Sequence, residues 1–448
     1  MRFILSLICL LTFTYAASAQ KTLSLEGAIQ IALNKNTTLQ KTENTLKTYE
    51  SGVKAAVGNF LPSLGAYGNW NWTKADEAGG TRYFQGTLIP VPSTSTQSRT
   101  YSVGASSNIT LFDGLSNYAT LSKSRKDLEA GRLSLERLKQ DIVFQTISLY
   151  YDVINARQLL KVKEDDVKWN QKNLETITER NKLGAVTLAD VYNQQVQTGN
   201  AELAVIQAKN DLETARTNLL YYLGLDVLEN YEFEEPSEGA DIETSDALKK
   251  LDSQDLSELV SKALDTRSDY RSAQLSLQSA VNGITIAKSG YLPRLTGGIS
   301  YQLTSDAIKT IDDSKYLNVS ATISIPIFSG FSTENQVQIA KVNAENKDIE
   351  LTELERNIKR NIQKNYLDLQ AAEKSLSVND KNVKAAEENR RIEQEKYSLG
   401  SGTLLNVLIA NSDYTTARTN YINAKFAYVV LNEQLKYYLG VLNYQQYE

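Results

Sequence analysis

The side chains that perform most enzymatic chemistry are nearly missing from this 448-residue chain. Histidine is absent, and the only cysteine is Cys9, close to the N-terminus. Zinc ligation, serine–histidine–aspartate catalysis and cysteine–histidine nucleophiles are therefore excluded if the N-terminal segment is removed. Carboxylates could still hydrolyse glycosides or bind Ca²⁺, but acidic and aromatic residues do not cluster at a suitable spacing. We therefore predict that the chain is not an enzyme, and we assign no cofactor and no metal ion.

The most distinctive residues form one short pattern that occurs twice. Residues 183–191 read LGAVTLADV, and residues 399–407 read LGSGTLLNV. In both copies leucine and glycine end a polar helical stretch, because glycine accepts the left-handed conformation that closes a helix. In the first copy Thr187 is a suitable N-cap for the next helix. The pattern therefore predicts the tips of two helical hairpins.

The first 19 residues are expected to be a signal peptide. Arg2 supplies a positive charge, residues 3–14 form an apolar segment, and residues 17–19 read ASA, a small-residue cleavage site. No cysteine follows that site, so a lipid-anchored lipoprotein is not expected. The signal predicts export to the periplasm or outer membrane of a Gram-negative bacterium.

Charge and hydropathy exclude two further classes. The formal net charge is −5, and this mild acidity argues against a nucleic-acid partner. After the signal peptide the sequence has no apolar run of about 18 residues, the length that a membrane-spanning helix needs. If the chain spans a membrane, it must therefore do so with strands.

The sequence is a tandem duplication. Gly184 and Gly400 are separated by 216 residues, and the same offset relates ITLFDG at 109–114 to IPIFSG at 325–330. Leu-Pro pairs upstream, at 61–62 and 292–293, are 231 residues apart, so the first half carries 15 extra residues after its Leu-Pro pair. Length variation belongs in exposed loops, and we place it in a long outer loop over 73–98.

Each half is predicted to contain a helix, two strands, a very long helix, a tip and another helix. The long helices, over 116–182 and 333–398, lack internal proline, and each would extend on the order of 100 Å. Their apolar residues step by three and four, as in coiled coils.

The predicted opening helices cover 24–57 and 257–289. We expect these divisions: a first repeat over 20–225, an acidic equatorial linker over 226–254, a second repeat over 255–441, and a C-terminal tail over 442–448.

Four segments alternate apolar and uncharged polar residues over about ten positions, the pattern of a transmembrane barrel strand. A soluble sheet is the alternative, but its outer face would carry lysine and glutamate. Four strands cannot close a barrel, and open edges are not tolerated in lipid, so three copies would form a 12-stranded barrel. The strands are expected at about 61–73, 99–112, 292–303 and 315–328, with a lipid-facing belt of Trp70, Trp72, Tyr101 and Tyr301.

This duplicated plan resembles the TolC family of outer-membrane efflux proteins, from the Leu-Pro pairs through Phe112–Gly114 and Phe328–Gly330 to the paired Leu-Gly tips. The resemblance implies a homotrimer whose transmembrane β-barrel continues into an α-helical coiled-coil tunnel across the periplasm. It implies export of small molecules or proteins across the outer membrane, with the barrel in contact with outer-membrane lipid. It also implies two kinds of partner, a periplasmic adaptor (membrane fusion) protein and an inner-membrane efflux pump or secretion transporter.

The resemblance further assigns roles to residues at the two tips. Asp190, Tyr397 and Asn406 take positions of a periplasmic gate, and Gly402 takes a place that can hold a basic residue. Ordinary helix caps, and a surface carboxylate at Asp190, are the plainer alternatives. The adaptor-docking residues implied are Leu183, Gly184, Ala185, Leu399, Gly400 and Ser401.

Two other functions compete with the channel. A periplasmic coiled-coil structural or adaptor protein without a membrane barrel would also be rich in helical hairpins. Adaptors, however, have a single hairpin flanked by lipoyl-type and β-barrel modules, whereas this sequence has two hairpins with strands between helices. A carboxylate enzyme on a helical scaffold is the other alternative, and it lacks a suitable acidic cluster.

Overall fold

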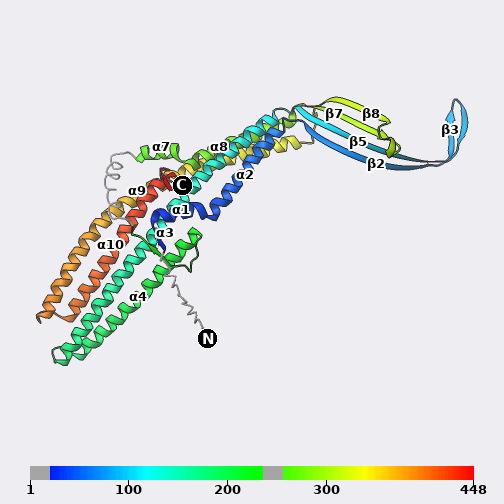
Figure 1. The fold of residues 1–448 in the computed structure, drawn as a ribbon. Coiled ribbons are helices and arrows are strands. Elements are labelled where there is room, and N and C mark those ends of the chain that lie inside the picture. The colour runs from blue at the N-terminus through cyan, green and yellow to red at the C-terminus, as the bar shows by residue number, and fades with distance from the viewer. Residues whose placement is uncertain (1–20, 236–255, 448) are drawn as a thin grey trace, which may run out of the picture. The chain divides into compact units, whose positions relative to one another are not determined.

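The computed structural model describes residues 21–235 and 256–447 (Figure 1). The expected signal peptide and most of the acidic linker lie outside these residues. The chain divides into two compact units, and Glu43–Ser134 with Asp269–Leu354 form the strand unit. The other described residues form the hairpin unit. Within the described ranges, no helix has an 18-residue stretch apolar enough to cross a membrane.

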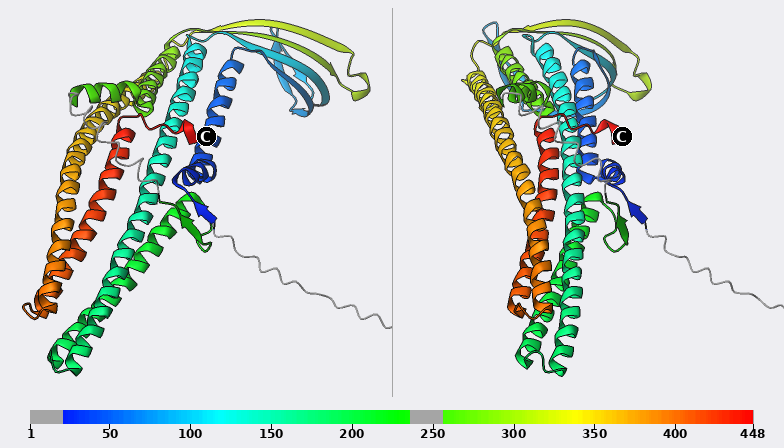
Figure 2. Two further views of the ribbon diagram at one scale, coloured as in Figure 1. Left: turned by 60° about the vertical axis from the view of Figure 1, so that its left-hand side comes forward. Right: turned by 90° about the vertical axis from the view of Figure 1, so that its left-hand side faces the viewer.

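Two very long helices, α3 (Ser116–Lys182) and α9 (Ser332–Ser398), have 67 residues each. The predicted bounds of α3 are those observed, and α9 begins one residue earlier than predicted. Each turns at its tip into an antiparallel partner, α4 (Leu188–Leu223) or α10 (Leu404–Tyr438), as Figure 2 shows. Lysine, glutamate, glutamine and leucine are frequent in both long helices, and all four residue types are good helix formers.

The prediction of one continuous opening helix in each half was wrong. The first divides into α1 (Leu25–Lys35) and α2 (Thr37–Gly58), and the second into α7 (Leu256–Thr266) and α8 (Ser268–Lys288). Asn36 causes the first break, because its backbone is extended and its Oδ1 accepts bonds from the N–H groups of Thr38 and Leu39 at 2.9 and 3.1 Å. At the second break the Arg267 side chain donates to the Tyr438 carbonyl at 2.9 Å.

The strand unit contains a four-stranded antiparallel sheet with the order β2-β5-β7-β8. Its strands are β2 (Ser63–Glu77), β5 (Thr94–Phe112), β7 (Arg294–Ser305) and β8 (Ser314–Ser324). β8 ends four residues before the predicted end at 328, since Pro326 has no N–H to continue the ladder. Short 3₁₀ helices cover Ser289–Tyr291, Ile308–Thr310 and, in the hairpin unit, Gln445–Tyr447.

The prediction of an outer loop over 73–98 was also wrong. β2 and β5 continue into this segment, and a separate hairpin of β3 (Gly80–Phe84) and β4 (Thr87–Val91) fills most of the remainder. Gln85 and Gly86 form the two-residue turn, with φ angles of 47° and 85°. Both values are positive, as a type I′ hairpin turn requires.

The core of the hairpin unit forms around the fully buried Tyr150 of α3. Its hydroxyl donates to the carbonyls of Leu23 and Glu234 at 2.9 and 2.6 Å. These two residues lie in or beside β1 (Lys21–Leu23) and β6 (Tyr231–Phe233), which pair in parallel. Burial raises the pKa of Tyr150 to about 12. Tyr150 therefore ties the N-terminal strand and the first residues of the linker to the long helix.

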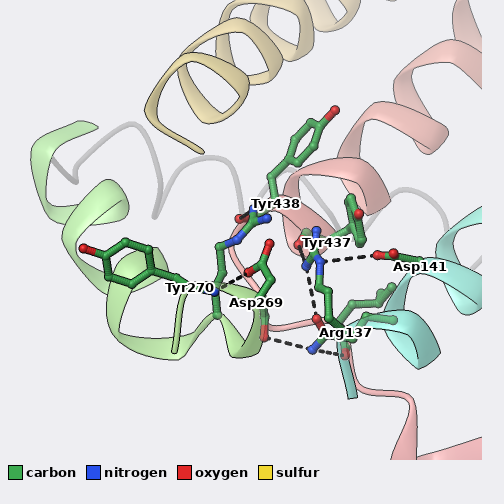
Figure 3. Close-up of polar contacts among 10 residues, drawn as sticks. Arg137, Asp141, Asp269, Tyr270, Tyr437 and Tyr438 are labelled. Carbon is green, nitrogen blue, oxygen red and sulfur yellow. Dashed lines mark hydrogen bonds and ion pairs between the residues drawn. The ribbon is translucent and has the colours of Figure 1, made fainter. Parts of the chain in front are cut away.

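Arg137 of α3 fixes the end of α10 (Figure 3). Its guanidinium carbon lies 3.7 Å from the ring centroid of Tyr437, and Nη1 donates to the Tyr437 carbonyl at 3.0 Å. Asp141 pairs with Arg137 Nε at 3.3 Å, although the Arg137 side chain is only 8% exposed. Burial of the Tyr437 phenol raises its pKa to about 12. Gln140 extends the attachment by donating to the Gly440 carbonyl at 3.3 Å.

Replacing Arg137 with methionine is expected to loosen this end of the chain. The apolar stem remains, but the charged hydrogen bond is lost, which costs about 2 kcal/mol. Amide hydrogen exchange over 435–447 should become about thirtyfold faster. Arg132→Met is the control, because Arg132 is 59% exposed and lies 3.7 Å from Glu50; it should leave this exchange unchanged. Equal exchange rates in the two variants would contradict the attachment.

Candidate functional site

The two tips close with the same backbone hydrogen bonds. Gly184 and Gly400 have φ angles of 75° and 77°, in the left-handed region. In the first tip Ala185 N donates to Arg180 O at 2.9 Å, and in the second Ser401 N donates to Lys396 O at 2.9 Å. Both are six-to-one bonds of a Schellman cap. The predicted glycine-closed turns are therefore present in both halves.

Each tip presents a leucine to solvent. Leu183 is 83% exposed and Leu399 is 76% exposed, although both are large apolar residues. The following residues of each tip, Gly184 and Ala185 or Gly400 and Ser401, are small and exposed. A projecting leucine beside small residues permits close approach of a partner surface.

Asp190 completes the N-terminal cap of α4. Its Oδ2 accepts from the Thr187 backbone N–H at 3.0 Å and from Thr187 Oγ1 at 2.8 Å, and its own N–H donates to Thr187 Oγ1 at 3.2 Å. This is a reciprocal capping box. At the second tip Asn406 N donates to Thr403 Oγ1 at 3.3 Å. Both predicted gate residues thus hold the third position of a helix.

Tyr397, the third predicted gate residue, is partly buried beneath Arg180 from the other hairpin. The guanidinium carbon lies 4.8 Å from the ring centroid, and Nη1 donates to the Tyr397 carbonyl at 3.4 Å. Burial raises the pKa of the Tyr397 phenol; Arg180 opposes this shift and the Asp190 carboxylate adds to it. The phenol is therefore neutral at pH 7, and Arg180 joins the end of α3 to the end of α9.

An apolar cluster lies behind this contact. Ile177 and Val191 of the first hairpin and Leu404 of the second are each less than 9% exposed. Tyr397 and Leu408 pack against them. The two tips are therefore held together by apolar burial as well as by Arg180.

A second set of polar contacts joins the hairpins further along α3. Arg418 Nη1 of α10 lies 3.1 Å from Asp165 Oδ2. Asp166 Oδ1 accepts from Asn411 Nδ2 at 2.7 Å and from Thr415 Oγ1 at 3.3 Å. These contacts are mostly charge-assisted hydrogen bonds, which are stronger than neutral ones. Sequence reasoning missed them because no short pattern links residues about 250 positions apart.

Arg180 was missed for a related reason. A basic residue in the last turn of a helix is expected from the helix dipole alone, so its position carried no further signal. Gly402 takes a place that can hold a basic residue in the family that the chain resembles, and an added Cβ there would lie 3.0 Å from the Tyr397 N atom. That crowding disfavours any side chain there, and the basic residue that lies beside Tyr397 is Arg180 of the other hairpin.

The sheet has one apolar and one polar face, as the alternation predicted. Trp70 pairs with Tyr101, and Tyr301 lies between Ala105 and Leu317 in the ladder. Paired residues point to the same side of a sheet, so these side chains share one face. Its most exposed large residues are Leu64 at 83%, Trp70 at 63%, Leu317 at 67%, Val319 at 73% and Ile323 at 62%.

The opposite face is lined by hydroxyl and amide groups. Tyr67 Oη donates to Gln302 Oε1 at 3.2 Å. The bond passes over Gly104, which pairs with both residues and has no side chain to block it. Ser102, on the same face, is only 8% exposed. A sheet whose apolar side is more exposed than its polar side is inverted relative to a soluble protein, and it matches a wall between lipid and water.

No group of histidine, cysteine, aspartate or glutamate in residues 21–235 and 256–447 is arranged to hold a metal ion. The described chain combines two joined helical tips with a sheet that has one apolar and one polar face. This combination is typical of outer-membrane channel-tunnels.

Comparison with known proteins establishes the family. The profile of the outer membrane efflux protein family matches residues 28–225 and 259–441. The chain is 25% identical to the outer membrane protein TolC of Escherichia coli over 354 residues, which cover 75% of this chain and 68% of TolC. It is 22% identical to the outer membrane efflux protein BepC of Brucella suis over 414 residues, 92% of this chain and 84% of BepC.

The fold has close counterparts among solved structures. The outer membrane protein VceC of Vibrio cholerae superposes with a TM-score of 0.78 at 17% identity, covering 93% of this chain and 96% of VceC. The chain therefore belongs to the outer membrane efflux protein family. It is an outer-membrane export channel, and the predicted resemblance, the channel-tunnel fold of the single chain and the location are confirmed.

Proposed function

We propose that three copies of this chain close a 12-stranded barrel in the outer membrane and that their helices form the periplasmic tunnel. The observation that carries this proposal is the open sheet with an exposed apolar face. Within residues 21–235 and 256–447, its outer strands β2 and β8 each pair on one side only. Unpaired edges are costly in lipid, and closure through symmetric copies removes them.

The hairpin tips are proposed to bind a periplasmic adaptor protein. Three copies would present six tips, each with its exposed leucine, Leu183 or Leu399. An inner-membrane pump or secretion transporter would supply the energy, and small molecules or proteins would pass through the polar interior. The belt residues Trp70, Trp72, Tyr101 and Tyr301 would contact lipid.

The gate is proposed to be closed in the conformation described above. Arg180 and Tyr397 join the two hairpins near their tips, and Asp165 and Asp166 join them further along. Opening the tunnel would require the hairpins to separate, so these contacts would break together. Asp190 would act by shaping the tip and by its charge near Tyr397, and Asn406 would line the constriction without charge.

The mass of the detergent-solubilised particle tests the trimer. Protein from the outer-membrane fraction is expected to have a mass of three mature chains after correction for bound detergent. It should also stay in the membrane during urea extraction, as integral proteins do. A monomer released into the soluble periplasmic fraction would support a coiled-coil adaptor instead.

A further inference from the structure

The β3–β4 hairpin is the part of the strand unit that the barrel does not account for. It forms its own two-stranded sheet at the end of β2 and β5 that lies away from the strand–helix junctions (Figure 1). An isolated two-stranded hairpin is at best marginally stable in water. Yet the segments that connect the hairpin to β2 and β5 are tightly packed, because a Cβ on Gly79 would lie 2.7 Å from Ser93 N.

Apolar side chains cover both faces of this hairpin. Tyr83 pairs with Leu88 on one face, and Arg82 pairs with Ile89 on the other, where Phe84 and Val91 also lie. All are exposed: Tyr83 by 71%, Phe84 by 60%, Leu88 by 62%, Ile89 by 45% and Val91 by 42%. Arg82 is the only charged residue between Glu77 and Arg99. Exposed apolar surface on this scale marks an interaction site.

The two apolar faces of the hairpin indicate what kind of partner covers it. A hairpin lying on lipid or on one soluble partner would need a single apolar face. In a ring of three copies, each hairpin near the axis has one neighbour on each side, and head-to-tail contacts use two different surfaces of the same chain. A second and third copy of this chain therefore fit better than a lipid surface.

The dimensions are compatible with such a ring. Twelve strands at about 4.8 Å spacing and about 40° tilt enclose a barrel of about 12 Å radius. A five-residue strand extends about 16 Å, and β3 and β4 have five residues each. A hairpin that turns inward from the wall can therefore reach the axis.

We propose that the β3–β4 hairpins of three copies pack face to face and cover the extracellular mouth of the barrel with an apolar lid. This inference rests on the proposed trimer. The corresponding connection in the second half, 306–313, is shorter and carries Asp306, Lys309, Asp312 and Asp313. It would stay in water beside the lid. The 15 extra residues of the first half would then serve to build this lid.

Cross-linking tests the lid directly. Cys9, in the expected signal peptide, is the only natural cysteine. The double variant Leu88→Cys with Ile89→Cys places one thiol on each face, and a short bis-maleimide should convert it to covalent dimers and trimers. Each single variant should stay monomeric on denaturing gels, since the ring joins unlike faces. Lys309→Cys is the control and should also remain monomeric.

The outcomes separate the lid from the trimer. A particle of trimeric mass whose double variant gives no covalent trimers would overturn the lid and leave the barrel intact, whereas a monomeric particle would overturn both. Quenching of a bimane label at Leu88→Cys by brominated lipids would assign the hairpin to the membrane instead. If the lid is present, serine at Tyr83, Phe84, Leu88 and Ile89 should further raise channel conductance in an Arg180→Ala background, where the periplasmic gate no longer limits it, without changing the particle mass.

Discussion

Arginine in place of Val319 is expected to prevent assembly of the protein in the outer membrane. Val319 is the middle residue of β8 and is 73% exposed on the apolar face. An arginine facing lipid at the bilayer midplane costs about 2–4 kcal/mol. Three copies would lose about 6–12 kcal/mol, which is comparable to the whole stability of a typical protein. Heat-resistant trimers in the outer-membrane fraction should therefore fall below detection.

Asn318→Arg is the matched control. Asn318 precedes Val319 on the same strand and is also exposed in the single chain, but it points to the polar face. The same charge would there face water in the channel interior. Normal trimer yield with conductance shifted toward anions is expected, because a ring of positive charge attracts them. If both variants assembled equally well, or if only Asn318→Arg failed, the assignment of the two faces would be wrong.

Sequence reasoning predicted the elements whose signal is periodic. The two-residue alternation that places Trp70 and Tyr101 on one face needs no knowledge of the partner strand. The tips were predicted because a left-handed helix end requires glycine, and Gly184 and Gly400 supply it. In both cases the physical constraint acts within a few residues.

The errors arose where local side-chain interactions or residue preferences, rather than periodicity or length, decided the structure. The apolar period continues through residue 36, so one helix was expected, but the Asn36 side chain captures the next N–H groups and starts a new helix. Residues 80–91 were assigned to a loop because length varies there, although their tyrosine, phenylalanine, leucine and isoleucine favour strands. Arg180 could not be linked to Tyr397, since that contact depends on how two hairpins pack.

Removal of the Arg180 side chain is expected to open the periplasmic end of the channel. The cation–π contact with Tyr397 and the charged hydrogen bond to its carbonyl contribute about 2 kcal/mol per copy. If the three copies open together, Arg180→Ala changes the open-to-closed ratio by a factor on the order of 10⁴. Single-channel recordings in planar bilayers should show a severalfold higher mean conductance, because a channel that is mostly closed becomes mostly open.

Lys182→Ala distinguishes the contact from a general effect of charge. Lys182 lies in the same last turn of α3, is 65% exposed and pairs only with the nearby Glu179 in the described structure, at 2.6 Å. The Lys182→Ala variant removes one positive charge from the same helix end as Arg180→Ala, and it should leave conductance unchanged. Since Arg180→Lys keeps the charge but loses the planar fork, it should recover only part of the closure. Equal conductance in the alanine variants of Arg180 and Lys182 would place the closure elsewhere, and the polar contacts of Asp165 and Asp166 would then be the remaining candidates.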